Sequence, residues 1–182
     1  MASKYHLSNP EGIYFITFAT VQWVDVLTRP HYKDIVVESL RYCQEKKGLD
    51  LYAWCLMTNH VHLIAAVRDT YNLSDLLRDL KKYTAKKLIA AIQNPEESRR
   101  AWLLWLFRAA GEHNPNNQNY QLWQQDNHPV ELSTNSMVAQ RLAYLHQNPV
   151  KAGIVFAPEH YVYSSAIDYA GGKGLLELAA FL

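Results

Sequence analysis

The stretch that decides the fold runs from residue 51 to residue 67 and reads LYAWCLMTNHVHLIAAV. It contains two short apolar runs, at residues 51–57 and 60–67, joined by Thr58 and Asn59. Two apolar runs separated by a polar pair are typical of a β-hairpin with a tight turn. The sequence therefore predicts two neighbouring antiparallel strands.

Clear secondary-structure patterns precede and follow this hairpin. Residues 12–21 (GIYFITFATV) are dense in aromatic and β-branched side chains, which predicts a largely buried strand. A helix is expected over residues 30–47, because a proline opens this stretch and Gly48 follows it. A second helix is expected over residues 74–92, with Ser74 as its N-cap.

The patterns are more varied in the carboxyl-terminal half of the chain. Residues 96–110 contain a cluster of leucine and tryptophan and predict another helix. Residues 111–125 are rich in Asn, Gln and Pro, which favours a loop, with a short strand around residues 120–124. A last helix is expected over residues 136–146, and Pro149 is expected to stop it.

This order of elements predicts an α+β fold in which helices pack on a mostly antiparallel sheet. A ferredoxin-like sheet is the first choice, because its split βαβ units begin in this order. With 182 residues, of which 49% are hydrophobic, we expect one domain spanning residues 1–182. Within it, a helical insertion is expected at about residues 95–111 and a carboxyl-terminal tail at about residues 156–182.

Composition also limits the partners of the protein. No apolar run approaches the roughly 20 residues that span a bilayer, and the amino terminus lacks the apolar stretch of a signal peptide, so we expect a cytoplasmic protein with no membrane partner. Cys43 and Cys55 lack the spacing of a zinc or redox motif and are expected to be reduced and buried. The net charge of +1 means that any nucleic-acid contact must come from local patches.

His60 and His62 are the first candidate functional residues. Side chains alternate along a strand, so both imidazoles point to the same face, with Val61 on the other. Two imidazoles at this spacing can chelate one transition-metal ion such as manganese, and magnesium also serves when substrate oxygens complete the shell. The alternative interpretation is that they are two polar residues on the wet face of a strand.

Tyr144 and Asn148 form the second candidate pair. Their spacing of four residues places both side chains on one helix face, although Pro149 disfavours helical backbone at Asn148. One could then be a nucleophile and the other a metal ligand. The alternative is a surface tyrosine beside an asparagine that caps the helix.

A local concentration of basic residues lies on the helix predicted over residues 74–92, with Tyr83 offering aromatic surface among them. This pattern could neutralise phosphates, but a solvated amphipathic helix has the same pattern. The candidate nucleic-acid-binding residues are Arg78, Lys81, Lys82, Lys86 and Lys87.

Two segments together resemble a known family. The segments at residues 59–63 (NHVHL) and 144–153 (YLHQNPVKAG) are similar to the single-tyrosine HUH transposases of the IS200 type. The closer match is to the branch associated with repetitive extragenic palindromes (REP), whose usual tail resembles residues 161–165 (YVYSS). The resemblance covers most of the chain, from the strand at residues 12–21 to Val155.

The resemblance implies a ferredoxin-like fold and an active site. His60, His62 and Asn148 would bind Mg²⁺ or Mn²⁺, and Tyr144 would attack the scissile phosphate to form a 5′-phosphotyrosine. Gln147 is the alternative third ligand, because better-known IS200-type members have glutamine there.

The resemblance also implies the reaction and the partner. The activity would be metal-dependent nicking and strand transfer of single-stranded DNA that contains a hairpin or palindromic repeat. The protein would act as a monomer or a homodimer. Tyr83, on the basic helix, is a competing candidate for the nucleophile.

An alternative function belongs to a different class: a domesticated relative that binds structured nucleic acid without cleaving it. The basic helix would then suffice for the function. A metal-dependent hydrolase of small phosphate esters is disfavoured, because the chain has neither a phosphate-cradling Gly-rich loop nor a carboxylate-rich metal site.

Overall fold

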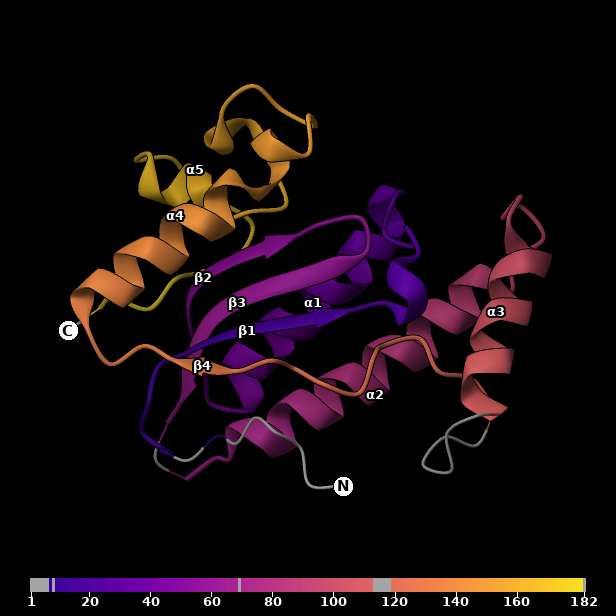
Figure 1. The fold of residues 1–182 in the computed structure, drawn as a ribbon, viewed down its shortest axis with the longest axis horizontal. Coiled ribbons are helices and arrows are strands. Elements are labelled where there is room, and N and C mark those ends of the chain that lie inside the picture. The colour runs from indigo at the N-terminus through magenta and orange to yellow at the C-terminus, as the bar shows by residue number, and fades with distance from the viewer. Residues whose placement is uncertain (1–6, 8, 69, 113–118, 182) are drawn as a thin grey trace.

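The computed structural model describes residue 7 and residues 9–68, 70–112 and 119–181. A four-stranded antiparallel sheet forms its centre, with the strand order β2-β3-β1-β4 (Figure 1). The expected α+β fold is confirmed, and the strand order agrees with the expected ferredoxin-like sheet. The strands are β1 (Tyr14–Ala19), β2 (Leu49–Leu56), β3 (His60–Val67) and β4 (Val130–Glu131).

The predicted hairpin is confirmed as β2 and β3, which pair antiparallel along their length. The turn between them is closed by a hydrogen bond from the Met57 N–H to the His60 carbonyl. On its other side, β3 pairs with β1, so that Thr17 lies opposite His62 and Ala19 lies opposite His60. This register brings residues about 45 positions apart in sequence into one site.

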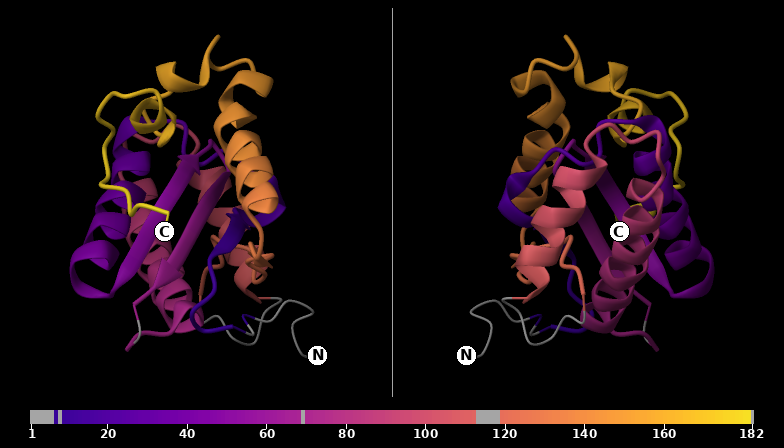
Figure 2. Two further views of the ribbon diagram at one scale, coloured as in Figure 1. Left: turned by 90° about the vertical axis from the view of Figure 1, so that its left-hand side faces the viewer. Right: turned by 90° about the vertical axis from the view of Figure 1, so that its right-hand side faces the viewer.

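Two helices, α1 (Pro30–Lys46) and α2 (Leu73–Ile92), cover one face of the sheet (Figure 2). Gly48 follows α1 with a φ of +67°, and a Cβ there would lie 2.2 Å from the Tyr71 ring, so only glycine fits. The predicted Ser74 cap is wrong, because the Asn72 side chain accepts the capping hydrogen bond from the Asp75 N–H. Serine and asparagine are both good caps, and the tertiary position of the chain decided between them.

Helix α4 (Asn135–Lys151) covers the opposite face and packs with Leu145 against Phe15 and Ile64 (Figure 2). Pro149 lies inside this helix, so the prediction that it stops the helix is wrong. A proline in the last turn costs only the one hydrogen bond that its nitrogen cannot donate. The helix ends two residues later at Lys151, and Gly153, just beyond it, has a φ of +69°.

Helix α3 (Arg100–Glu112) lies beyond one end of the sheet and packs against α2 (Figure 1). It starts later than predicted, because residues 94–99 form turns that bury the Glu97 side chain. Its leucines and Phe107 enter the main core, whereas Trp102 and Trp105 are exposed. The Trp-rich segment thus packs on the core by its leucines, not by Trp102 and Trp105.

The short strand predicted around residues 120–124 is not formed. Residues 120–124 form only one isolated bridge, from Trp123 to Thr20, and Val130–Glu131 supplies β4. Trp123 is instead a core residue, whose indole N–H donates to Thr84. Residues 113–118 of the predicted loop lie outside the described residues.

The carboxyl-terminal segment lies along the free edge of β2. It contains two short helices, η2 (Pro158–His160) and α5 (Ala166–Tyr169). Backbone hydrogen bonds join Tyr163, Ser165 and Ala179 to this edge. Within the described part of the chain, none of the helices is both long and apolar enough to cross a membrane.

Candidate functional site

The two histidines of β3 form the centre of the candidate site. His60 and His62 lie on the sheet face that α4 covers, and their ring centroids are 4.7 Å apart. His62 is buried, and its Nε2 atom has no hydrogen-bond partner among the described residues. A buried imidazole nitrogen without a partner is costly in a protein that uses it only structurally, and it is available as a metal ligand.

The neighbouring residues fix which nitrogen of His60 carries the hydrogen. The Asn59 side-chain N–H donates to the Trp23 carbonyl at 3.0 Å, which turns the amide oxygen toward His60. This oxygen lies 2.6 Å from Nδ1 of His60 and can only accept, so Nδ1 carries the hydrogen. The lone pair of His60 is therefore on Nε2, the form that binds a cation.

The ring of His62 is held on two sides by β1. Its Nδ1 atom is hydrogen-bonded to the Thr17 hydroxyl at 2.7 Å, and the Phe15 ring stacks on the imidazole at 5.3 Å. If Nδ1 donates to Thr17, Nε2 is left with its lone pair, the form that a metal ligand needs.

The surroundings keep both histidines neutral near pH 7. Burial, the neighbouring His60 and Arg141 lower the pKa of His62 to about 3. Burial also lowers the pKa of His60, although a hydrogen bond with Asn148 and the charge of Asp25 oppose the shift. Neutral imidazoles are the form that binds metal ions, so neither histidine must lose a proton first.

Tyr144 reaches the histidines from α4. Its ring lies 5.4 Å from the His62 ring and 6.0 Å from the Phe15 ring, and the side chain is 41% exposed. Two basic residues of the same helix flank it: Lys151 has its ammonium 5.8 Å from the Tyr144 ring, and Arg141 lies over Phe15 at 5.0 Å. The tyrosine is thus open to solvent between two positive charges, on the side of the histidines.

Asn148 completes the group of four predicted residues that the structure brings together. It hydrogen-bonds with His60, and its side-chain N–H is 3.4 Å from the Tyr144 carbonyl. Gln147, the alternative ligand, is exposed. The contact with His60 therefore favours Asn148 as the third ligand.

The donor set fits a divalent cation that shares its ligands with a substrate. Among the described residues, no group of three His, Cys, Asp or Glu side chains could hold a metal ion. The protein offers two imidazole nitrogens and one amide oxygen, which leaves room for phosphate and water oxygens. Mn²⁺ and Mg²⁺ accept such mixed, oxygen-rich shells.

The basic residues predicted on α2 lie on the sheet face opposite to the histidines (Figure 2). Lys81 donates to the carbonyls of Gln124 and Gln125 and to the Asn127 side chain, so it holds this segment against β1. Arg78 pairs with Asp75 and Asp79. The remaining members of the set are exposed: Lys82, Lys86 and Lys87.

Sequence reasoning missed several residues that shape the site: Asn59, Thr17, Arg141 and Lys151. Thr17 had a detectable signal, since it is the one polar residue between Tyr14 and Ala19 and lies two positions from Phe15 on the same face. Arg141 and Lys151 lie three residues before and seven after Tyr144, the spacing of one helix face. Thr17 could be assigned to His62 only once the register of β1 and β3 was known.

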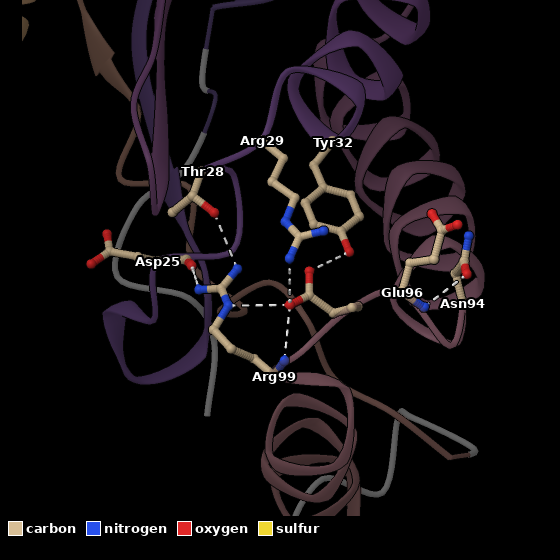
Figure 3. Close-up of polar contacts among 8 residues, drawn as sticks. Asp25, Thr28, Arg29, Tyr32, Asn94, Glu96 and Arg99 are labelled. Carbon is tan, nitrogen blue, oxygen red and sulfur yellow. Dashed lines mark hydrogen bonds and ion pairs between the residues drawn. The ribbon is translucent and has the colours of Figure 1, made fainter.

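A buried ionic network anchors the loop beside the histidines to the start of α3 (Figure 3). Glu97 accepts hydrogen bonds from the Tyr32 hydroxyl and the Arg99 backbone and pairs with Arg29. Arg99 in turn donates to the Asp25 carbonyl and the Thr28 hydroxyl.

These contacts give Glu97 its charge state and its role. Burial alone would raise the pKa of Glu97, but the hydrogen bonds from Tyr32 and Arg99 lower it, so the carboxylate is ionised. The Asp25 carboxylate accepts from Thr58 in the β2–β3 turn, next to Asn59 and His60. The network therefore links α3 to the turn that carries the histidines.

Comparison with known proteins identifies the class of this fold and site. Residues 11–108, more than half of the chain, match the family described as IS200-like transposases. The chain therefore belongs to the IS200-like transposase family. The matched segment includes both histidines and ends before Tyr144 and Asn148.

Solved structures give the likeness in fold. A REP-associated tyrosine transposase bound to a REP hairpin superposes with a TM-score of 0.64 and 16% sequence identity, over 99% of this chain and 93% of that one. A putative transposase from Deinococcus radiodurans gives a TM-score of 0.45 and 19% identity, over 80% of this chain and 96% of that one. No curated protein matches the sequence significantly.

Proposed function

We propose that this protein nicks and rejoins single-stranded DNA, with Tyr144 as the nucleophile and a divalent cation held by His60, His62 and Asn148. The observation that carries the proposal is the meeting of a solvent-open tyrosine with a buried, neutral imidazole whose Nε2 lacks a partner, at a ring distance of 5.4 Å. Membership of a transposase family supports DNA as the substrate.

In the proposed reaction, Tyr144 replaces the 3′ oxygen on the scissile phosphate. The Tyr144 oxygen forms a bond to the phosphorus, the bond from phosphorus to the 3′ oxygen breaks, and a 5′-phosphotyrosine results. The phenolic proton leaves to solvent, and the 3′ oxygen gains one. Bound Mg²⁺ or Mn²⁺ would supply Lewis-acid stabilisation of the phosphate charge.

Other residues prepare the site before the reaction. Thr17, Phe15 and Asn59 hold the two imidazoles so that the lone pair of each would lie on Nε2. Arg141 and Lys151 would attract the DNA backbone to the face that carries Tyr144. Rejoining is the reverse reaction, in which a 3′ hydroxyl attacks the phosphotyrosine.

The DNA would be single-stranded beside a hairpin or palindromic repeat, as in the REP hairpin bound by the structural relative. Because the exposed lysines of α2 lie on the opposite sheet face, they would contact DNA away from the cleaved bond. Placement within the REP-associated branch rests on this likeness in fold and on the segments at residues 144–153 and 161–165.

Covalent capture tests the proposal. The protein is incubated with Mn²⁺ and labelled single-stranded DNA from both sides of its gene, and adducts are resolved on a denaturing gel. We expect an adduct with wild type that is absent in Tyr144→Phe, in His62→Ala and in the presence of a chelator. Tyr83→Phe is the matched control and should retain the adduct.

Two results would contradict the proposal: no adduct with any hairpin-containing strand, or an adduct that persists in Tyr144→Phe. DNA binding that survives chelation without any adduct would instead favour the alternative, a relative that binds structured nucleic acid without cleaving it.

A further inference from the structure

Trp23 is an exposed aromatic residue at the edge of the candidate site. Its side chain is 53% exposed, and its ring lies edge-on to the His60 ring at 5.5 Å. It belongs to the short helix η1 (Val21–Trp23), which follows β1 directly. A large apolar side chain exposed beside a polar site is a candidate contact for a flat ligand.

The backbone holds Trp23 in this place against its own preference. Gln22 and Trp23 have backbone φ values of 53° and 56°, which residues other than glycine rarely adopt. Hydrogen bonds oppose the strain: the Trp23 N–H donates to the Thr20 carbonyl, and the Trp23 carbonyl accepts from Asn59. Strain that is held by surrounding contacts is concentrated at functional sites.

Ring contacts follow one another from Trp23 to His60, from His60 to His62, and from His62 to Tyr144. The distances are 5.5, 4.7 and 5.4 Å. Trp23 and Tyr144 are therefore at opposite ends of the series, with the two metal-binding candidates between them. A phosphate bound at the histidines would have the nucleophile on one side and the indole on the other.

We propose that Trp23 stacks on the base of the nucleotide that leaves with the free 3′ hydroxyl, on the 5′ side of the cleaved bond. This inference rests on the proposed function. In an in-line displacement the attacking and leaving oxygens lie on opposite sides of phosphorus. Because Tyr144 attacks from one end of the ring series, the leaving nucleotide lies toward the other end, where Trp23 is exposed.

The stacking is general for DNA bases and does not require a particular sequence, since every base has a flat π-face. It fixes the leaving nucleotide while the 3′ oxygen departs, and keeps it in place for rejoining. Trp23 is in this sense a positioning residue.

Binding measurements on uncut DNA test the inference apart from cleavage. The affinity of Tyr144→Phe protein for labelled, hairpin-containing single-stranded DNA from either side of the gene is measured in the presence of a chelator. The double variant that also carries Trp23→Ala should bind about 5- to 100-fold more weakly, the usual effect of losing one base stack. Trp23→Phe should restore most of the affinity. Trp105→Ala, which removes an even more exposed tryptophan on α3, is the matched control and should change little.

An abasic scan separates stacking from a merely structural role. Single abasic nucleotides are placed along the unpaired segments, and each substrate is tested with and without Trp23→Ala. One position should lose affinity in the protein with Trp23 and show no further loss in Trp23→Ala. The covalent adduct, mapped independently, should begin immediately 3′ of that position.

Three results would overturn the inference: Trp23→Ala that binds as tightly as its parent, equal loss at every abasic position, or a coupled position on the 3′ side of the cut. The first two do not depend on whether an adduct forms, so failure of the proposed function is seen separately in the gel assay; the third applies once the adduct has located the cut.

Discussion

Replacing Thr17 with valine should weaken metal binding while leaving the fold intact. Valine has nearly the same shape, but it cannot hydrogen-bond to Nδ1 of His62, which now lies 2.7 Å from the hydroxyl. The Phe15 ring still covers one side of the imidazole, so the His62 ring stays in place. Without the Thr17 hydroxyl, however, nothing determines which of its two nitrogens carries the hydrogen. Loss of such a second-layer partner lowers metal affinity about 10- to 100-fold, or about 1.4–2.7 kcal/mol.

The assay is titration of Mn²⁺ into the protein, followed by electron paramagnetic resonance of the free ion. Thr17→Ser, which keeps the hydroxyl, is the matched control and should bind Mn²⁺ nearly as wild type does. The rate of adduct formation at limiting Mn²⁺ should fall in parallel with affinity. Equal Mn²⁺ affinity in Thr17→Val and wild type would refute the reasoning that Thr17 selects the ligand form of His62.

Three further outcomes follow from the geometry. Asn148→Ala should lower Mn²⁺ affinity and adduct rate about 10-fold or more, whereas Gln147→Ala should change either less than twofold; the reverse order would assign the third ligand to Gln147. Glu97→Ala should lower the free energy of unfolding in urea by about 3 kcal/mol, because buried donors lose their acceptor, whereas exposed Glu96→Ala should change it by less than about 0.5 kcal/mol; equal losses would contradict this. In metal-free protein the pKa of His62 is about 3, whereas an unfolded histidine gains a proton near pH 6.5, so the contribution of His62 to stability should be constant above about pH 7.5 and fall as the pH drops from 6.5 toward 3. His62→Gln should show a shallower fall in the same denaturation series, and an unchanged slope would argue against the shift.

The elements that could be predicted from sequence are those whose pattern is local. The hairpin at residues 51–67 and the helix after Pro30 carry strand alternation, helix periodicity and end signals within their own residues. Their limits were correct to within two residues. These elements place the two histidines on one face, so the central feature of the site was accessible before the structure.

The elements that could not be predicted depend on distant partners. Trp123 looked like a strand residue, but it fills the main core between α2 and β1, and the edge strand forms later in the chain. Pro149 looked like a helix stop, but packing of α4 on the sheet tolerates the one lost hydrogen bond. Local preference yields to tertiary packing at both positions.

Charge was the hardest property to interpret from sequence alone. Lys81 belongs to a basic helix, yet its three hydrogens are used on the segment at residues 124–127. Arg141 and Lys151, which flank Tyr144, stood out in no cluster. Which basic side chains face the site depends on the side of the sheet on which each helix packs. The sequence alone does not reveal that side.

Mapping the covalent bond tests the central claim most directly. After incubation with Mn²⁺ and single-stranded DNA, the adduct is digested with trypsin and nuclease, and the peptide that carries a nucleotide is identified by mass spectrometry. Trypsin releases Tyr144 in the peptide at residues 142–151 and Tyr83 in the peptide at residues 83–86. We predict a phosphodiester-linked nucleotide on Tyr144 alone; a nucleotide on Tyr83, or on neither peptide, would contradict the account.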